Sequence, residues 1–224
     1  MQIATSAKDP TVLTYLALRK AVGYMAFGLP FAVAIPWWLV HHVLQSSISD
    51  YYYTGTRNLF VGSLCAISMF LLSCRGFDRK DQVAGMFSAV CALGVAFFPT
   101  TPDCPTPRQR DIGYAHYTFA ALLFLTLAYF CLVLFKMTAA NRTVTRKKLQ
   151  RNLVYTVSGW VIIASIAALA ATKILGLKYS ILTFGPVFFF ESTSLLAFGT
   201  AWLIKGETFL KDQNVLPPVI PPNP

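Results

Sequence analysis

Long apolar runs alternate with short polar segments along the whole chain. Each of six runs comes close to the roughly 20 residues that a helix needs to cross about 30 Å of hydrocarbon. The runs cover residues 21–45, 58–74, 82–98, 112–135, 153–172 and 181–204. This pattern predicts an all-α fold, a polytopic membrane protein built as a six-transmembrane-helix bundle.

The two ends of the chain differ from the predicted membrane domain, residues 21–206. In residues 1–20, Asp9-Pro10 is typical of a helix start. We expect either a short interfacial helix there or an extension of the first span. Residues 207–224 are proline-rich and predict a polyproline-like or disordered tail. The first apolar run exceeds a signal-peptide core and no A-x-A-like site follows, so we expect it to be retained.

Composition supports the same class of protein. The chain is 55% hydrophobic and 12% charged, whereas soluble domains are about one quarter charged. The net charge is +10. If the N-terminus is cytoplasmic, 14 of the 19 Lys and Arg residues fall in cytoplasmic segments. This excess predicts cytoplasmic N and C termini. The basic segments are interpreted as contacts with anionic membrane lipids, and no nucleic-acid motif accompanies them.

The sequence lacks the motifs that are typical of several enzyme classes. The five cysteines form no C-x-x-C pair, which argues against a disulfide framework or a zinc knuckle. The sequence also lacks a phosphate-binding loop, a G-x-S-x-G nucleophile turn and an H-E-x-x-H motif. Candidate chemistry therefore rests on scattered polar residues.

The densest polar stretch is Ser49–Asn58, between the first two runs. Asp50 is a candidate catalytic carboxylate, and Arg57 is expected to hold an anionic group. Asn58 and Tyr53 are further candidate ligand-binding residues. This stretch holds more hydrogen-bonding groups than a turn between two spans requires.

Two polar residues lie inside predicted spans. His116 is near the start of the fourth run, and Glu191 lies in the middle of the sixth. A carboxylate at that depth costs at least about 2.5 kcal/mol, so Glu191 should face the bundle interior. Gly185-Pro186 predicts a kink just before it. Because Glu191 is expected roughly 15 Å from the outer end of its helix, it meets His116 only if that kink, or a different helix boundary, closes the gap.

Two roles fit these residues. In one, His116 and a carboxylate bind zinc together with His41 or His42 and Asp50, and the metal activates a water. In the other, Glu191 pairs with Arg57 or with hydroxyl groups, and His116 is a hydrogen-bonded packing residue. The residues themselves leave both roles open.

Three motifs carry a family resemblance: S-I-S-D-Y-Y-Y-T-G-T-R-N-L-F-V-G, A-L-G-V-A-F-F-P and F-F-F-E-S-T-S-L-L-A-F-G-T-A-W-L-I-K-G. With the His116 region they resemble the DUF998-like proteins, an uncharacterised family of bacterial multi-pass membrane proteins, over about residues 20–206. The resemblance implies a bacterial cytoplasmic (inner) membrane location and no particular activity.

Two more distant similarities point to lipids. The arrangement of an acidic outer loop, an early His in the fourth span and a Glu in the last span is similar to the DRAM/Sfk-type six-helix proteins, which are linked to lipid handling. Ser49–Asn58 is similar to the E-x-Y-N-T-x-S-N stretch of alkaline ceramidases, which are zinc amidases. The chain lacks their last-helix H-x-x-x-H, which puts three-histidine zinc in doubt.

The predicted function is an outward-facing polar cavity that binds or processes a lipid or lipid-linked group. His116, Glu191 and Asp50 are the candidate catalytic residues, Arg57, Asn58 and Tyr53 the candidate ligand contacts, and His116 and His42 the candidate metal ligands. The alternative is a non-enzymatic membrane transporter or scaffold. The sequence defines neither a substrate nor an oligomeric state.

Overall fold

The computed structural model describes residues 10–73, 79–137, 145–174, 185–206 and 208, and within them it contains helices and no strand. The predicted all-α class is therefore confirmed. The six long helices are α1 (Pro10–His41), α2 (Arg57–Ser73), α3 (Arg79–Phe97), α4 (Pro107–Leu132), α5 (Arg146–Ile174) and α6 (Pro186–Lys205). Two short 3-10 helices accompany them, η1 (Ser49–Tyr53) and η2 (Leu134–Lys136). Of the predicted tail, residues 207–224, the structure describes only Thr208.

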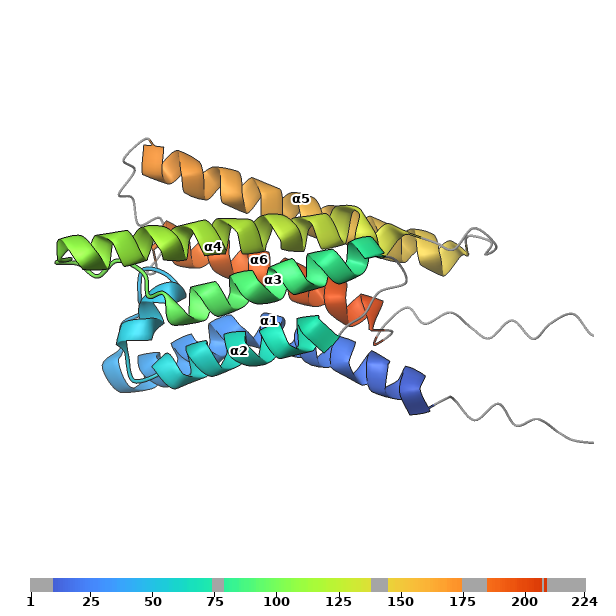
Figure 1. The fold of residues 1–224 in the computed structure, drawn as a ribbon, viewed down its shortest axis with the longest axis horizontal. Coiled ribbons are helices and arrows are strands. Elements are labelled where there is room, and N and C mark those ends of the chain that lie inside the picture. The colour runs from blue at the N-terminus through green and yellow to red at the C-terminus, as the bar shows by residue number, and fades with distance from the viewer. Residues whose placement is uncertain (1–9, 74–78, 138–144, 175–184, 207, 209–224) are drawn as a thin grey trace, which may run out of the picture.

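Successive long helices run in opposite directions (Figure 1). Each packs against its neighbours in sequence, and α1 packs against α6, so the six form a closed ring. α4 also contacts α6 across the ring. We call the end that holds η1 the η1 end. The opposite end, where α1, α3 and α5 begin, is called the basic end, because Arg79, Lys80, Lys136, Arg146 and Lys205 lie there.

Among the described residues, four stretches are long and apolar enough to cross a membrane, namely Leu16–His41, Pro107–Lys136, Arg146–Thr172 and Pro186–Lys205. α2 is apolar but has only 17 residues. α3 opens with the charged run Arg79-Lys80-Asp81. The structure therefore gives four candidate spans, and the count of six stays a prediction.

The outer faces of the helices are apolar. Leu39, Met69 and Trp160 are each 61% exposed, on α1, α2 and α5 respectively. Many other large apolar side chains of the helices are exposed as well, whereas soluble monomers rarely expose large contiguous apolar patches. Together with the four long apolar helices, this exposure indicates an integral membrane protein.

Helix starts explain two differences from the predicted boundaries. α4 begins at Pro107 because Thr106 and Gln109 form a capping box, in which each side chain accepts a hydrogen bond from the other residue's backbone N–H. α6 begins at Pro186, with Gly185 as the preceding cap. Proline is well suited to the first helical position because no N–H bond is lost there. The predicted kink at Gly185-Pro186 is therefore wrong, since these residues start the helix.

Candidate functional site

The loop of residues 42–56, here called the η1 loop, connects α1 to α2 and folds back onto the η1 end of the bundle (Figure 1). α1 ends where His42 adopts a φ of 55°, in the left-handed region that stops a helix. Its N–H still donates to the Trp38 carbonyl at 2.8 Å. Ile48 and Ser49 are buried, and Tyr51 is completely buried with its ring centroid 6.2 Å from that of Phe188.

Glu191 joins this loop to α6. The backbone N–H of Ile48 donates to Glu191 Oε2 at 2.7 Å. In the opposite direction, the N–H of Phe188 donates to the Ser46 carbonyl at 2.9 Å. The first N–H groups of a helix lack partners within it, so the loop carbonyl satisfies one of them. Glu191 lies in the second turn of α6.

His116 joins the same loop to α4. Its Nδ1 lies 2.6 Å from the Phe98 carbonyl oxygen, and its Nε2 lies 2.9 Å from Ser49 Oγ. A carbonyl only accepts, so Nδ1 carries the proton in this bond. In the neutral ring Nε2 then accepts from the Ser49 hydroxyl. The side chain is 1% exposed, and both ring nitrogens are engaged.

The tyrosines add a third attachment. Tyr53 donates its hydroxyl to the Thr100 carbonyl at 2.6 Å, and Thr100 Oγ1 donates to the Tyr117 hydroxyl at 3.2 Å. The Tyr51 hydroxyl accepts from the Gln45 N–H at 3.3 Å. Burial raises the pKa of Tyr51 and of Tyr53 above the ordinary value of 10.0. Both phenols therefore remain protonated at neutral pH, and Tyr53 stays available as a donor.

The predicted ligand contacts at the start of α2 lie on the surface. Arg57 donates from Nη2 to the Tyr52 hydroxyl at 2.6 Å, and its guanidinium carbon is 4.2 Å from the centroid of that ring. Arg57 and Asn58 are exposed, and Tyr53 is 48% exposed. Asp50 is half-buried, and its N–H donates to Ser47 Oγ at 3.0 Å. The structure thus divides the predicted site into an inner pair, the buried His116 and the half-buried Glu191, and a more exposed group.

The predicted metal ligands do not form a cluster. The ring centroids of His41 and Trp37 are 3.7 Å apart, and those of His42 and Trp38 are 6.1 Å apart. Within the described ranges, no three His, Cys, Asp or Glu side chains lie close enough together to hold a metal ion. The zinc site therefore stays a prediction with no matching group of ligands in the described part of the chain.

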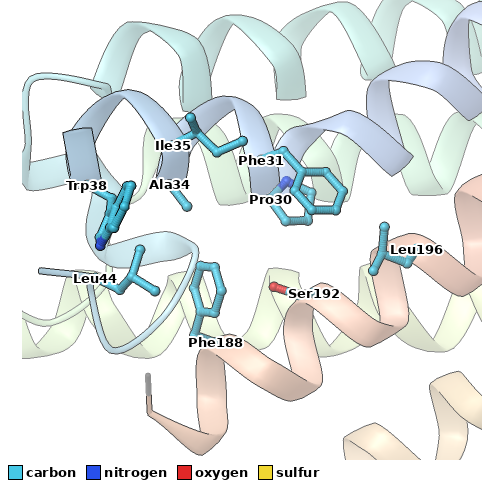
Figure 2. Close-up of a pocket in the computed structure, with 9 residues that line it drawn as sticks. All are labelled: Pro30, Phe31, Ala34, Ile35, Trp38, Leu44, Phe188, Ser192 and Leu196. Atoms are coloured by element: carbon cyan, nitrogen blue, oxygen red, sulfur yellow. The ribbon is translucent and has the colours of Figure 1, made fainter. Parts of the chain in front are cut away.

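A cavity of about 290 Å³ lies between α1 and α6 near the η1 end (Figure 2). Apart from Ser192, its lining residues are all apolar: Pro30, Phe31, Ala34, Ile35, Trp38, Leu44, Phe188 and Leu196. In Figure 2 Ser192 lies on α6 between Phe188 and Leu196. Its Oγ is buried and has no hydrogen-bond partner among the described residues. A buried hydroxyl of this kind usually finds a partner, so the cavity wall offers one unused hydrogen-bonding group.

Ser192 was not among the residues singled out from the sequence. Its position follows from helical spacing, because Phe188, Ser192 and Leu196 are four residues apart and share one face. That spacing is visible in the sequence, but the facing residues of α1 are not. The sequence favours the neighbouring Glu191 as a candidate, because a charge inside a membrane span costs more free energy than a hydroxyl.

Comparison with known proteins gives no relative. No protein-family model, curated protein or solved structure matches the chain. The resemblance to the DUF998-like proteins therefore stays a prediction from three motifs. The class supported by the structure is an all-helical integral membrane protein.

Proposed function

We propose that this integral membrane protein binds the acyl chain of a lipid in the cavity between α1 and α6 and does not alter it chemically. The observation that carries the proposal is the unpartnered Ser192 hydroxyl in an otherwise apolar wall. Apolar walls with few polar groups are typical of small-molecule sites. A lipid ester carbonyl supplies the acceptor that Ser192 lacks, and the acyl chain fills the apolar part.

A binding role fits His116 and Glu191 better than a catalytic role. His116 has both nitrogens engaged, with Phe98 and Ser49, and is 1% exposed. Glu191 accepts the Ile48 N–H. An acid or base must reach the proton it transfers. We therefore assign both residues to holding the η1 loop, whose Leu44 forms part of the cavity wall. This proposal agrees with the non-enzymatic alternative and dispenses with zinc.

We further propose that the η1 end faces outward and the basic end faces the cytoplasm. The excess of Lys and Arg in the predicted cytoplasmic segments supports this orientation. In that arrangement the cavity is filled from the outer leaflet. For a member of the DUF998-like family, the membrane would be the bacterial cytoplasmic membrane.

The test uses the full chain in vesicles of phosphatidylcholine containing a phosphatidylcholine with a diazirine in one acyl chain. Photolabelling of residues 30–44 and 188–196 is mapped by peptide mass spectrometry and competed with unlabelled phosphatidylcholine. Saturable labelling is expected. Ser192→Ala should weaken it about two- to tenfold, the usual range for one hydrogen bond. Ala34→Phe should block it by filling the cavity.

Thr193→Ala is the matched control. Thr193 is the next hydroxyl on α6, but it donates to the Phe189 carbonyl of its own helix at 2.8 Å. It should leave the labelling unchanged. If the labelling does not saturate, or if Ser192→Ala and Thr193→Ala behave alike, the proposed site is wrong.

A further inference from the structure

A second cavity, of about 570 Å³, lies between α3 and α4 toward the basic end and is here called the groove. Its lining residues are Arg79, Lys80, Val83, Ala84 and Phe87 of α3 and Thr126 and Tyr129 of α4. The two helices are in tighter contact nearer the η1 end, where Gly94 packs directly against the Phe119 ring.

The lining residues are ordered along α3 by polarity. Arg79 and Lys80 stand at the first turn, Val83 and Ala84 follow one turn later, and Phe87 comes after a further turn. Residues three and four apart share a helix face, so these side chains form one stripe. The stripe is cationic at the basic end and apolar beyond it. That order matches the headgroup and acyl chain of a phospholipid.

The walls have the exposure that a lipid chain requires. Val83 is 53% exposed, Phe87 44% and Tyr129 38%. Thr126 donates its hydroxyl to the Leu122 carbonyl at 2.7 Å, so this hydroxyl already has a hydrogen-bond partner within its own helix. Asp81 lies in the same turn as the two basic residues but is not among the lining residues. The start of α3 adds its own preference for negative charge.

We propose that this groove binds one anionic phospholipid of the leaflet at the basic end. Arg79 and Lys80 hold the phosphate, and Val83, Phe87 and Tyr129 hold the first part of an acyl chain. The inference is independent of the α1–α6 cavity, since it concerns other helices and the opposite end. It identifies a headgroup preference, which nothing in the α1–α6 cavity provides.

The test is a lipid titration of the purified full chain in detergent micelles, followed by native mass spectrometry. The probe is dioleoyl phosphatidylglycerol, compared with dioleoyl phosphatidylcholine, which has the same chains and no net charge. One saturable phosphatidylglycerol is expected. Arg79→Gln/Lys80→Gln should weaken its binding roughly tenfold, since each basic residue near anionic lipid contributes a few-fold or more. Val83→Trp should block it by filling the groove with no change in charge.

Arg146→Gln/Lys147→Gln is the matched control. It removes the same charge from the start of α5, at the same end of the bundle but outside the groove. Its effect should stay below about twofold. Equal losses in the two double variants would mean that only diffuse attraction operates, and the proposal would fail. It would also fail if phosphatidylcholine bound equally well, or if soluble glycerol 3-phosphate competed as strongly as the lipid.

Discussion

Glu191 of α6 and His116 of α4 hold consecutive residues of one loop. Glu191 Oε2 accepts the N–H of Ile48 at 2.7 Å, and His116 Nε2 lies 2.9 Å from the hydroxyl of Ser49. The η1 loop therefore supplies a hydrogen-bond partner to each of these two side chains, and Phe98 supplies the second partner of His116. Because the loop is bound from two helices at adjacent positions, loss of either contact should loosen it.

The pair Ser49–His116 can be measured by a double-mutant cycle. Ser49→Ala should lower the free energy of unfolding by about 1–2 kcal/mol, because it leaves His116 Nε2 buried without a partner. His116→Phe should cost at least as much, because it leaves both the Ser49 hydroxyl and the Phe98 carbonyl unpaired. The double variant should show a coupling of about 1 kcal/mol. The measurement is unfolding by dodecyl sulfate in dodecyl maltoside micelles, followed by circular dichroism.

Ser63→Ala, on α2 outside the η1 loop, serves as the control and should change the unfolding free energy by less than about 0.5 kcal/mol. Strict additivity of Ser49→Ala and His116→Phe would contradict a direct bond.

Glu191 can be tested by separating charge from hydrogen bonding. In Glu191→Gln the side chain keeps an oxygen that accepts the Ile48 N–H, but a neutral acceptor is weaker than a carboxylate. In Glu191→Leu no acceptor remains. Hydrogen exchange of the Ile48 amide should speed up a few-fold in the first variant and at least tenfold in the second, as the loop opens more often.

Amides in the middle of α2 should not change and serve as the internal reference. Equal exchange at Ile48 in Glu191→Leu and the unmodified protein would exclude the carboxylate as its anchor. If Glu191→Gln abolished an ion-coupled uptake while the exchange stayed normal, the transporter alternative would be supported instead.

The sequence predicted that Glu191 turns away from lipid, but not what it meets. An intramembrane acid demands a partner, and that demand is a local property of the sequence. Its partner is the backbone N–H of Ile48, 143 residues away in the chain. Every residue except proline has such an N–H, so the sequence does not indicate which one is the partner. Glu191 also lies nearer the η1 end than the predicted span, residues 181–204, implies, because α6 starts at Pro186. The predicted kink was unnecessary.

The same reasoning applies to the exposed group. The sequence predicts that Arg57, Asn58 and His116 line one cavity, because all three are expected near the outer side of the membrane. The loop and the start of α2 that follows it have an inner and an outer face, however, and residue order does not show on which face each side chain lies. Ser49 and Tyr51 face inward, whereas Arg57 and Asn58 are exposed. The capping box at Thr106 and Gln109 was readable from the sequence and would have corrected the start of α4.

The orientation can be tested with a native thiol. Cys104 is exposed in the segment between α3 and α4 at the η1 end, while Cys65 is half-buried and Cys91 and Cys131 are buried. In a Cys74→Ser background, a membrane-impermeant maleimide should label Cys104 in intact cells within minutes. The labelled protein is read by a mass shift.

Lys147→Cys in a background that lacks Cys104 and Cys74 is the control for the basic end. It should be labelled only after the membrane is permeabilised. The reverse result for the two thiols would invert the orientation, and the cavity between α1 and α6 would then open to the cytoplasmic leaflet.

Contact between α1 and α6 gives a last prediction, because the lipid cavity lies along the same pair of helices. A Cβ at Gly199 would lie 2.7 Å from the Phe27 backbone nitrogen and 2.9 Å from the Gly23 carbonyl oxygen. Backbone cannot move aside as a flexible side chain can, so Gly199→Ala must push the helices apart. Such overpacking usually costs about 1–3 kcal/mol. In lipid, where small residues let helices approach, the loss should appear as a lower unfolding free energy.

Gly28→Ala on α1 is the matched variant, because a Cβ there would meet nothing within 4 Å. It should be neutral or stabilise the protein by up to about 1 kcal/mol, the helix-propensity difference between alanine and glycine. The two alanines thus should have opposite or clearly unequal effects in the same dodecyl sulfate titration. Displacement of α6 should also widen the cavity and weaken saturable photolabelling in Gly199→Ala but not in Gly28→Ala. Equal stability of the two variants would show that α1 and α6 are not in backbone contact, and the cavity between them would lose its supporting wall.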